Sequence, residues 1–412
     1  MYVISIGVPF LPDGPNRALV KTDWAQSLRL LRDSFDGRFG TIVVAAPQYA
    51  PTDTFADQSP ETLHANEDIR FVAVGRFDWR LRRYWLNDHR VRAAYDRAVR
   101  DADIVHASVN DILRPFGLRG FQAALRHAIP TVWVEDTDII LQNRQLLGGG
   151  GLRSRLEMHV RNASLHRQTA RAVAAADLTL LKGQALMQRY ACFGRNVREI
   201  MNVSIRHDWI VPADRLANRL ADGTTRRPLR CLSVGRLITR KGVDHSIRAV
   251  HHARQRGADL QLDVIGSGQQ QPQLDQLARQ LDLESCVRFL GPRNYGPRLI
   301  DEMATYDAFL FTPLCEDTPR SIFDAMAAAL PIVAYDIPYT RQLVDANACG
   351  LLAPLLAHEQ LAHQLLQIAA RPDTLCSMAR ASREAALANT AETWYRRRAE
   401  WTVEAWRQAR SR

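Results

Sequence analysis

Two carboxylates that could act on one ligand lie close together in the sequence, Glu316 and Asp324, separated by seven residues. The residues around them predict a short buried strand over 308–312, a polar loop, and a helix that begins near Pro319, since proline fits the first helical turn. A second buried strand follows at 332–335. In such a unit the loop and the helix start lie at the carboxyl edge of a parallel sheet, where backbone N–H groups favour phosphate. The spacing therefore favours carboxylates that bracket a phosphorylated ligand.

Taken alone, an acidic pair of this kind is more often a loop end and a solvated helix residue. Here the surrounding pattern, E-x7-[E/D]-A-M-A with Pro319 and Ser321 inside it and LPIVA behind it, resembles the donor-site signature of retaining glycosyltransferases of family 4. A second motif of that family, SVGRL followed by RKG, lies upstream at 233–242. The resemblance covers 229–407 well and 1–205 only weakly.

The resemblance implies an α/β fold of the GT-B type, with two Rossmann-like domains facing each other across a cleft. Apolar runs that alternate with helical stretches through the first half also indicate a parallel sheet covered on both faces. We expect an acceptor-side domain at 1–207, a nucleotide-sugar-binding domain at 208–390, and a C-terminal helix at 391–412 that packs back on the first domain.

The same resemblance implies transfer of a hexose from a nucleotide diphosphate sugar to an acceptor hydroxyl, with retention, in polysaccharide or glycolipid biosynthesis. Glu316 would contact the donor sugar, and Asp324, where the family usually has glutamate, would bind the ribose. Arg236 and Lys241 would oppose the charge that grows on the departing diphosphate. The remaining expected donor contacts are Gly235, Gly266, Pro292, Arg293, Pro319, Arg320, Ser321 and Ile322. Neither a metal ion nor another cofactor is expected.

The first domain offers weaker candidates for the same cleft. Gly14 and Asn16 lie in a turn after the first strand, where the family usually carries paired glycines. His106 ends another strand, and a lone histidine there is more often a core residue. Glu135 and Asp136 follow a further strand, at a position where the family commonly has a histidine. They could hydrogen-bond acceptor hydroxyls or merely solvate a loop.

Composition and charge limit which class of protein this can be and which partners it can have. The 412 residues suffice for two domains, and the formal net charge of +10 favours an anionic partner. Arginines mixed with aromatic residues over 76–100, and a basic helix over 153–171, suit an anionic membrane surface or a lipid-pyrophosphate acceptor. No nucleic-acid signature is present. Because the N-terminus lacks a basic leader and no long apolar run occurs, we expect a cytoplasmic protein, peripheral at most to the inner face of the plasma membrane.

Two other functions remain open at this stage. One is a catalytically silent scaffold subunit that binds a nucleotide sugar, suggested by Ser108 and Glu135 and by the lone Gly14, where relatives carry other residues. The other is a sugar-nucleotide epimerase of the same architecture, which would show no dependence on an acceptor. Slow hydrolysis of the donor would distinguish an enzyme from a scaffold. The sugar, the base and the acceptor cannot be read from the sequence.

Overall fold

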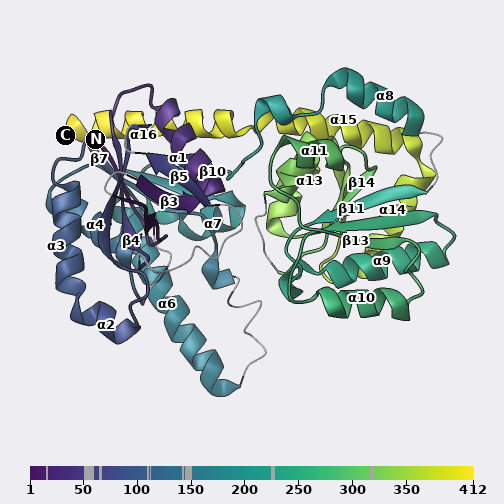
Figure 1. Cartoon of the computed structure of the whole chain (residues 1–412), viewed down its shortest axis with the longest axis horizontal. Helices are drawn as coiled ribbons and strands as arrows, with labels where there is room; N and C mark the ends of the chain where they lie inside the picture. Colours follow the sequence, from purple (N-terminus) through teal and green to yellow (C-terminus); the bar gives the residue numbers. More distant parts are fainter. Residues whose placement is uncertain are drawn as a thin grey trace. The chain divides into compact units, whose positions relative to one another are not determined.

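The computed structural model describes residues 1–412 except 15–16, 51–59, 65–66, 109–110, 112, 142, 144–150, 224–227 and 316–319. The chain forms two compact units (Figure 1). Unit 1 comprises Met1–Ile140, Gly151–Asn202 and Glu392–Arg412, and unit 2 comprises Leu141–Gly150 and Val203–Ala391. The chain thus passes into unit 2 after Asn202, whereas the sequence placed the junction at 207, and it returns to unit 1 for the C-terminal helix.

Unit 1 is built on a seven-stranded sheet in the order β10-β9-β8-β7-β1-β4-β6. All neighbouring strands run parallel. Most residues of the central strands are buried, because helices cover both faces of the sheet. The strands are β1 (Tyr2–Ser5), β4 (Ile42–Gln48), β6 (Ile69–Arg76), β7 (Ile104–Ala107), β8 (Thr131–Glu135), β9 (Leu178–Lys182) and β10 (Val197–Ile200).

The helices of unit 1 supply the two apolar layers beside that sheet. Val91, Tyr95 and Val99 of one helix pack with Ala123 and Ala124 of another in one buried cluster. The C-terminal helix joins the unit through Trp406, whose ring meets Phe39 edge-on at 5.5 Å. The helices are α1 (Thr22–Ser34), α2 (Leu81–Leu86), α3 (Asp88–Val99), α4 (Phe116–Arg126), α6 (Leu152–Ala175), α7 (Gly183–Tyr190) and α16 (Ala391–Arg410).

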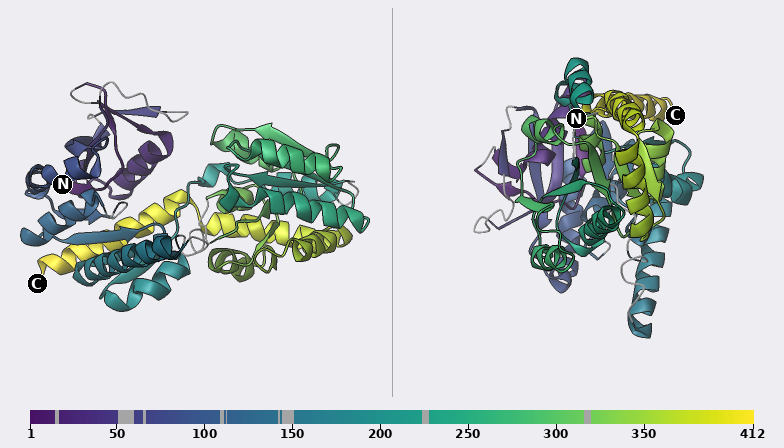
Figure 2. Two further views of the ribbon diagram at one scale, coloured as in Figure 1. Left: turned by 90° about the horizontal axis from the view of Figure 1, so that it is seen from below. Right: turned by 90° about the vertical axis from the view of Figure 1, so that its right-hand side faces the viewer.

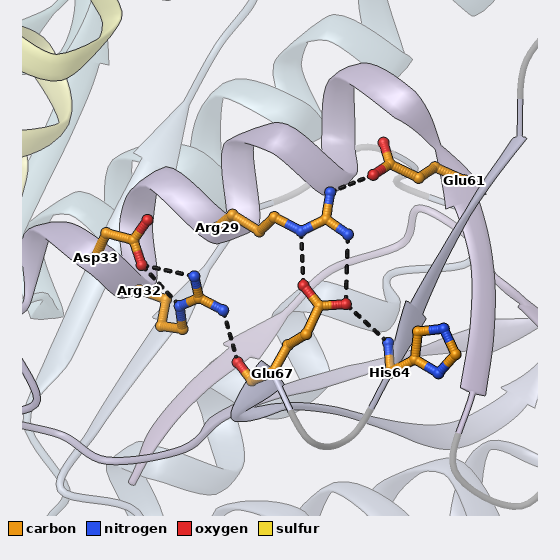
Figure 3. Close-up of polar contacts among 6 residues, drawn as sticks. All are labelled: Arg29, Arg32, Asp33, Glu61, His64 and Glu67. Atoms are coloured by element: carbon orange, nitrogen blue, oxygen red, sulfur yellow. Dashed lines mark hydrogen bonds and ion pairs between the residues drawn. The ribbon is translucent and has the colours of Figure 1, made fainter.

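A small antiparallel sheet of β2 (Leu11–Pro12), β3 (Arg17–Lys21) and β5 (Pro60–His64) stands where the sequence suggested a simple turn after strand one. Arg29 of α1 ties this sheet to the unit, since its guanidinium contacts both Glu61 and Glu67 (Figure 3). The Arg29 Nε to Glu67 Oε2 distance is 2.6 Å. The dipeptide Asp13-Gly14 is a hairpin signal that could have revealed the sheet.

Unit 2 is built on a six-stranded parallel sheet in the order β13-β12-β11-β14-β15-β16. Its strands are β11 (Leu229–Val234), β12 (Leu260–Ile265), β13 (Val287–Gly291), β14 (Ala308–Phe311), β15 (Ile332–Tyr335) and β16 (Gly350–Ala353). Its helices are α8 (Ala213–Gly223), α9 (Val243–Gln255), α10 (Gln271–Gln280), α11 (Pro297–Met303), α12 (Ser321–Ala327), α13 (Pro338–Asn347), α14 (His358–Ala370) and α15 (Pro372–Ala388).

Candidate functional site

The order of strands in unit 2 identifies where a ligand is expected. From β11 the chain adds β12 and β13 on one side and then β14, β15 and β16 on the other. In open α/β sheets, ligands bind outside the carboxyl ends of the strands at the point where this order reverses. That point lies between β11 and β14. The loop after β11 carries Arg236 and Lys241, and the loop after β14 leads to Asp324.

The structure joins these two loops through backbone contacts. The N–H of Leu314 donates to the carbonyl of Arg240 at 2.9 Å. The Thr312 hydroxyl donates to the Gly242 carbonyl at 2.7 Å. Gly242 adopts φ +61°, and a Cβ atom there would lie 2.0 Å from the Thr312 carbonyl oxygen. Only glycine therefore permits this approach, which holds the 235–242 loop against the end of β14.

A third loop, after β12, completes the edge. The N–H of Leu237 donates to the carbonyl of Ser267 at 2.9 Å, beside a close approach of Gly266 to Gly235. A Cβ atom on Gly266 would lie 1.8 Å from the Gly235 carbonyl oxygen. The G-x-G sequence after β12 thus allows close packing between the loop after β12 and the 235–242 loop, which is the candidate phosphate-binding loop.

The two cations differ in their surroundings. Arg236 is exposed at the start of the loop. Lys241 is half-buried at the end of a 3-10 turn over Thr239–Lys241, and its Nζ lies 6.0 Å from the centroid of the Phe311 ring. An exposed guanidinium can fork onto two phosphate oxygens, and a lysine beside it adds a compact charge. The loop is therefore chemically suited to an anionic group at the switch point.

Asp324 is the buried carboxyl of the site, with 4% of its surface exposed. The hydroxyl of Tyr295, in the loop after β13, donates to Asp324 Oδ1 at 3.1 Å. Burial raises the pKa of Asp324 to about 7, while the bond from Tyr295 and the charge of Arg320 act in the opposite direction. Sequence reasoning missed Tyr295, because no motif marks its loop and its partner is remote along the chain.

Other expected donor contacts have varied positions. Arg293 is held by Glu302, with Nε 2.9 Å from Oε2, and Pro292 beside it is exposed. Arg320 donates from Nη1 to the Ser204 hydroxyl at 3.1 Å, directly before α12. Ser321 is half-buried and Ile322 is fully buried in the first turn of that helix. Glu316 and Pro319 lie outside the described residues, so their predicted roles stay predictions.

In unit 1, His106 is a core residue rather than a surface one. It lies on β7 with 8% of its surface exposed, and its Nδ1 is 2.9 Å from the Tyr2 hydroxyl. Burial lowers the pKa of His106 to about 3, so its imidazole is neutral at physiological pH. Its contacts are those of a hydrogen-bonded core histidine, the more common case for a lone histidine at a strand end.

Glu135 ends β8 as a buried carboxyl, 6% exposed. Its Oε1 accepts hydrogen bonds from Trp133 Nε1 at 3.1 Å and from the Thr169 hydroxyl at 3.3 Å. Burial raises the pKa of Glu135 to about 8, with a contribution from nearby Asp136. Glu135 is thus largely protonated at neutral pH. Asp136 itself is exposed, and Gly14 lies at the hairpin between β2 and β3 with φ +87°, while Asn16 is outside the described residues.

We predict that Glu135→Gln stabilises unit 1 in alkaline solution. A carboxyl whose pKa is higher in the folded state contributes full stability below its unfolded pKa, and this is lost as pH rises through the folded value. Glutamine keeps the acceptor for Trp133 and Thr169 but does not ionise. Thermal unfolding gives the free energy of unfolding of both proteins at each pH between 5 and 9. The difference between the two free energies should grow with pH to the order of a few kcal/mol. Parallel curves across that range would contradict the assignment.

The comparisons with known proteins fall mainly on unit 2. Residues 221–385 match the family described as glycosyl transferases group 1. This segment is therefore similar in sequence to group 1 glycosyltransferases. The match covers β11 to most of α15, including Arg236, Lys241 and Asp324.

Individual relatives are similar over part of their length. The chain is 34% identical over 150 residues to the amylovoran biosynthesis glycosyltransferase AmsK of Erwinia amylovora, a stretch that covers 34% of this chain and 36% of that protein. It is 28% identical over 146 residues to the putative colanic acid biosynthesis glycosyltransferase WcaL of Escherichia coli, a stretch that covers 34% of this chain and 35% of that protein. The matches thus span little more than a third of either relative's length.

Solved structures match the whole chain in fold. WaaG, a glycosyltransferase involved in lipopolysaccharide biosynthesis, aligns with a TM-score of 0.63 at 16% identity, covering 97% of this chain and 99% of that one. HepE of Anabaena in complex with UDP aligns at 0.66 and 17% identity, covering 98% and 100%. These likenesses confirm the predicted GT-B class of fold. Among the described residues, no group of three or more metal-ligating side chains is arranged to hold an ion.

Proposed function

We propose that the protein transfers a sugar from a nucleoside diphosphate donor to an acceptor hydroxyl, with retention at the anomeric carbon. The observation that carries the proposal is the contact between the 235–242 loop and the β14 loop at the switch point of unit 2. Arg236 and Lys241 belong to the first of these loops, and the buried carboxyl of Asp324 belongs to α12, which follows the second. UDP is bound by HepE, which shares the fold.

The proposed chemistry uses these groups at the departing diphosphate. The bond between the anomeric carbon and the diphosphate oxygen breaks, the acceptor oxygen bonds to that carbon, and the acceptor proton passes to the departing diphosphate. Negative charge grows on the diphosphate in the transition state, where Arg236 and Lys241 would oppose it without reorganisation. Glu316 would contact the reacting sugar, and Asp324 would accept hydrogen bonds from the ribose. We propose that no metal ion is required, so a chelator should leave the rate unchanged.

For the acceptor, we propose a growing glycan or a lipid-linked sugar in polysaccharide or glycolipid biosynthesis. The biosynthetic roles in the names of AmsK, WcaL and WaaG support this class. A lipid-linked acceptor would bring the protein to the inner face of a membrane, as a peripheral protein.

A thermal-shift screen against nucleotide sugars tests the donor assignment. Binding at a hundredfold excess over Kd adds ~2.7 kcal/mol of stability, which corresponds to a rise of about 5–10 °C in Tm for a unit of this size. One nucleotide class should therefore stand out. The absence of any shift would contradict the proposal.

Assays with the selected donor then separate the three candidate functions. A transferase should hydrolyse the donor slowly and transfer its sugar when an acceptor is added. A scaffold subunit should bind the donor and leave it intact. An epimerase should release an epimeric nucleotide sugar with no acceptor present.

A further inference from the structure

Unit 1 exposes large apolar side chains on two helices. On α2, exposure reaches 43% for Leu81, 49% for Trp85 and 66% for Leu86. On α6, it reaches 67% for Leu156 and 64% for Val160. An isolated exposed leucine needs no explanation, but clustering on one six-residue helix and on one helical face does.

The α6 residues form a second apolar face on a helix that already buries one. Leu156 and Val160 are four residues apart and therefore neighbours on the helix surface. Met158, Asn162 and Leu165, which are buried, face the interior of unit 1. At 100° per residue the two sets lie on opposite sides of the helix. Leu156 and Val160 therefore point away from the core.

Exposed arginines lie beside both apolar clusters, and Glu157 is the exposed acidic residue next to Leu156. Arg80, Arg82 and Arg83 of α2 and its N-cap are exposed, as are Arg155 and Arg161 on α6. None of these five side chains forms a salt bridge with a residue that the structure describes. Their charge is therefore available to an anionic partner.

The two helices lie on the same side of unit 1. Figure 1 shows α2 and the first turns of α6 at the lower side of the unit, and the right-hand view of Figure 2 shows α6 extending beyond the other helices of unit 1. A single extended surface can thus touch both. No helix among the described residues is long and apolar enough to cross a membrane.

We propose that this α2–α6 surface, in which exposed arginines lie beside Leu81, Trp85, Leu86, Leu156 and Val160, docks unit 1 on an anionic lipid bilayer. The combination of exposed apolar side chains with exposed arginines is the chemistry that binds headgroups and the upper acyl region together. A second copy of this chain would bring like charges together. A nucleic acid would use the arginines but gain little from exposed leucine and valine.

This surface would supply the membrane contact proposed above for a lipid-linked acceptor, but its docking does not depend on the transfer reaction. Vesicle binding needs no sugar donor, and donor binding is assigned to unit 2. A failure of vesicle binding therefore leaves the nucleotide-sugar screen interpretable, and a failure of that screen leaves vesicle binding interpretable.

The test measures co-sedimentation of the full-length protein with phosphatidylcholine vesicles, with and without phosphatidylglycerol. Binding should require phosphatidylglycerol and weaken with salt, because surface attraction is screened within ~8–10 Å at physiological ionic strength. Arg82→Glu with Arg83→Glu should weaken partition about tenfold or more, since each arginine near an anionic surface is worth about fivefold. Leu156→Ser with Val160→Ser should weaken it at unchanged net charge.

Arg256→Glu with Arg380→Glu is the matched control, because both arginines are exposed on unit 2. This variant should bind vesicles as the wild type does, and all variants should keep the wild-type Tm. The proposal is overturned if the wild type ignores anionic vesicles at low salt, if the control loses binding equally, or if serine at 156 and 160 has no effect. Preferential binding of an oligonucleotide over vesicles would also overturn it.

Discussion

Replacing either Arg236 or Lys241 by alanine should lower the rate of donor turnover by two or more orders of magnitude. Deleting one preorganised group that opposes transition-state charge costs ~3 kcal/mol, or somewhat more than a hundredfold. Both side chains belong to the loop that contacts the end of β14 at the switch point of unit 2. Affinity for the free nucleoside diphosphate should fall too, since the leaving group carries the same phosphates.

The surroundings of Arg236 make the first of these variants easy to interpret. Its side chain is exposed, so truncation leaves no cavity in the core of unit 2. Arg248→Ala is a matched control, because Arg248 is an exposed arginine on α9 of the same unit. Initial rates and equilibrium titrations of the three variants would decide the matter. Near wild-type turnover in both Arg236→Ala and Lys241→Ala would mean that the phosphate site is elsewhere.

Much of unit 2 could be predicted from the sequence because its signals are local. The apolar runs at 308–312 and 332–335 correspond to β14 and β15, and the loop after β11 lies where the motif placed it. Short buried strands between turn residues produce such runs wherever a parallel sheet is covered on both faces.

The features that escaped prediction depend on contacts between distant residues. Tyr295 reaches Asp324 from a loop after β13, and Thr169 reaches Glu135 from α6. Neither pair leaves a periodic or compositional trace. The burial of Glu135 was equally hidden, since a carboxyl at a strand end is usually solvated. Such burial changes its chemistry by keeping it protonated near neutral pH.

Asp324→Ala should weaken nucleoside diphosphate binding by about tenfold or more, because each hydrogen bond to a charged group contributes ~1.5–3 kcal/mol. Ribose contacts serve ground and transition states alike, so turnover of bound donor should change little. Glu316→Gln should instead reduce turnover chiefly, since a carboxylate beside the reacting sugar gains strength as positive charge develops there. Equal loss of affinity in both variants would remove this division of roles.

The pH dependence of nucleotide binding gives a sharper test of Asp324. Its pKa is raised to about 7 by burial, and a carboxylate that accepts two ribose hydroxyls must be ionised. Binding should therefore release a proton below pH 7, with affinity falling up to about tenfold per pH unit on the acid side and levelling above the pKa. Asp324→Asn is the matched control, because its affinity should no longer depend on the ionisation of residue 324. Only the pH dependence caused by titration of the phosphate itself should remain.

Tyr295→Phe should shift the pH dependence of nucleotide affinity that Asp324 causes to higher pH. The Tyr295 hydroxyl donates to Asp324 and thereby lowers its pKa, so removing the donor favours the protonated carboxyl. The variant should bind more weakly than the wild type at pH 7 and equally well once Asp324 is fully ionised. Weakening that is the same at every pH would show that Tyr295 contacts the nucleotide directly instead of acting through the carboxylate. Calorimetric titrations in buffers of different ionisation enthalpy would measure the proton release and locate the step in each protein.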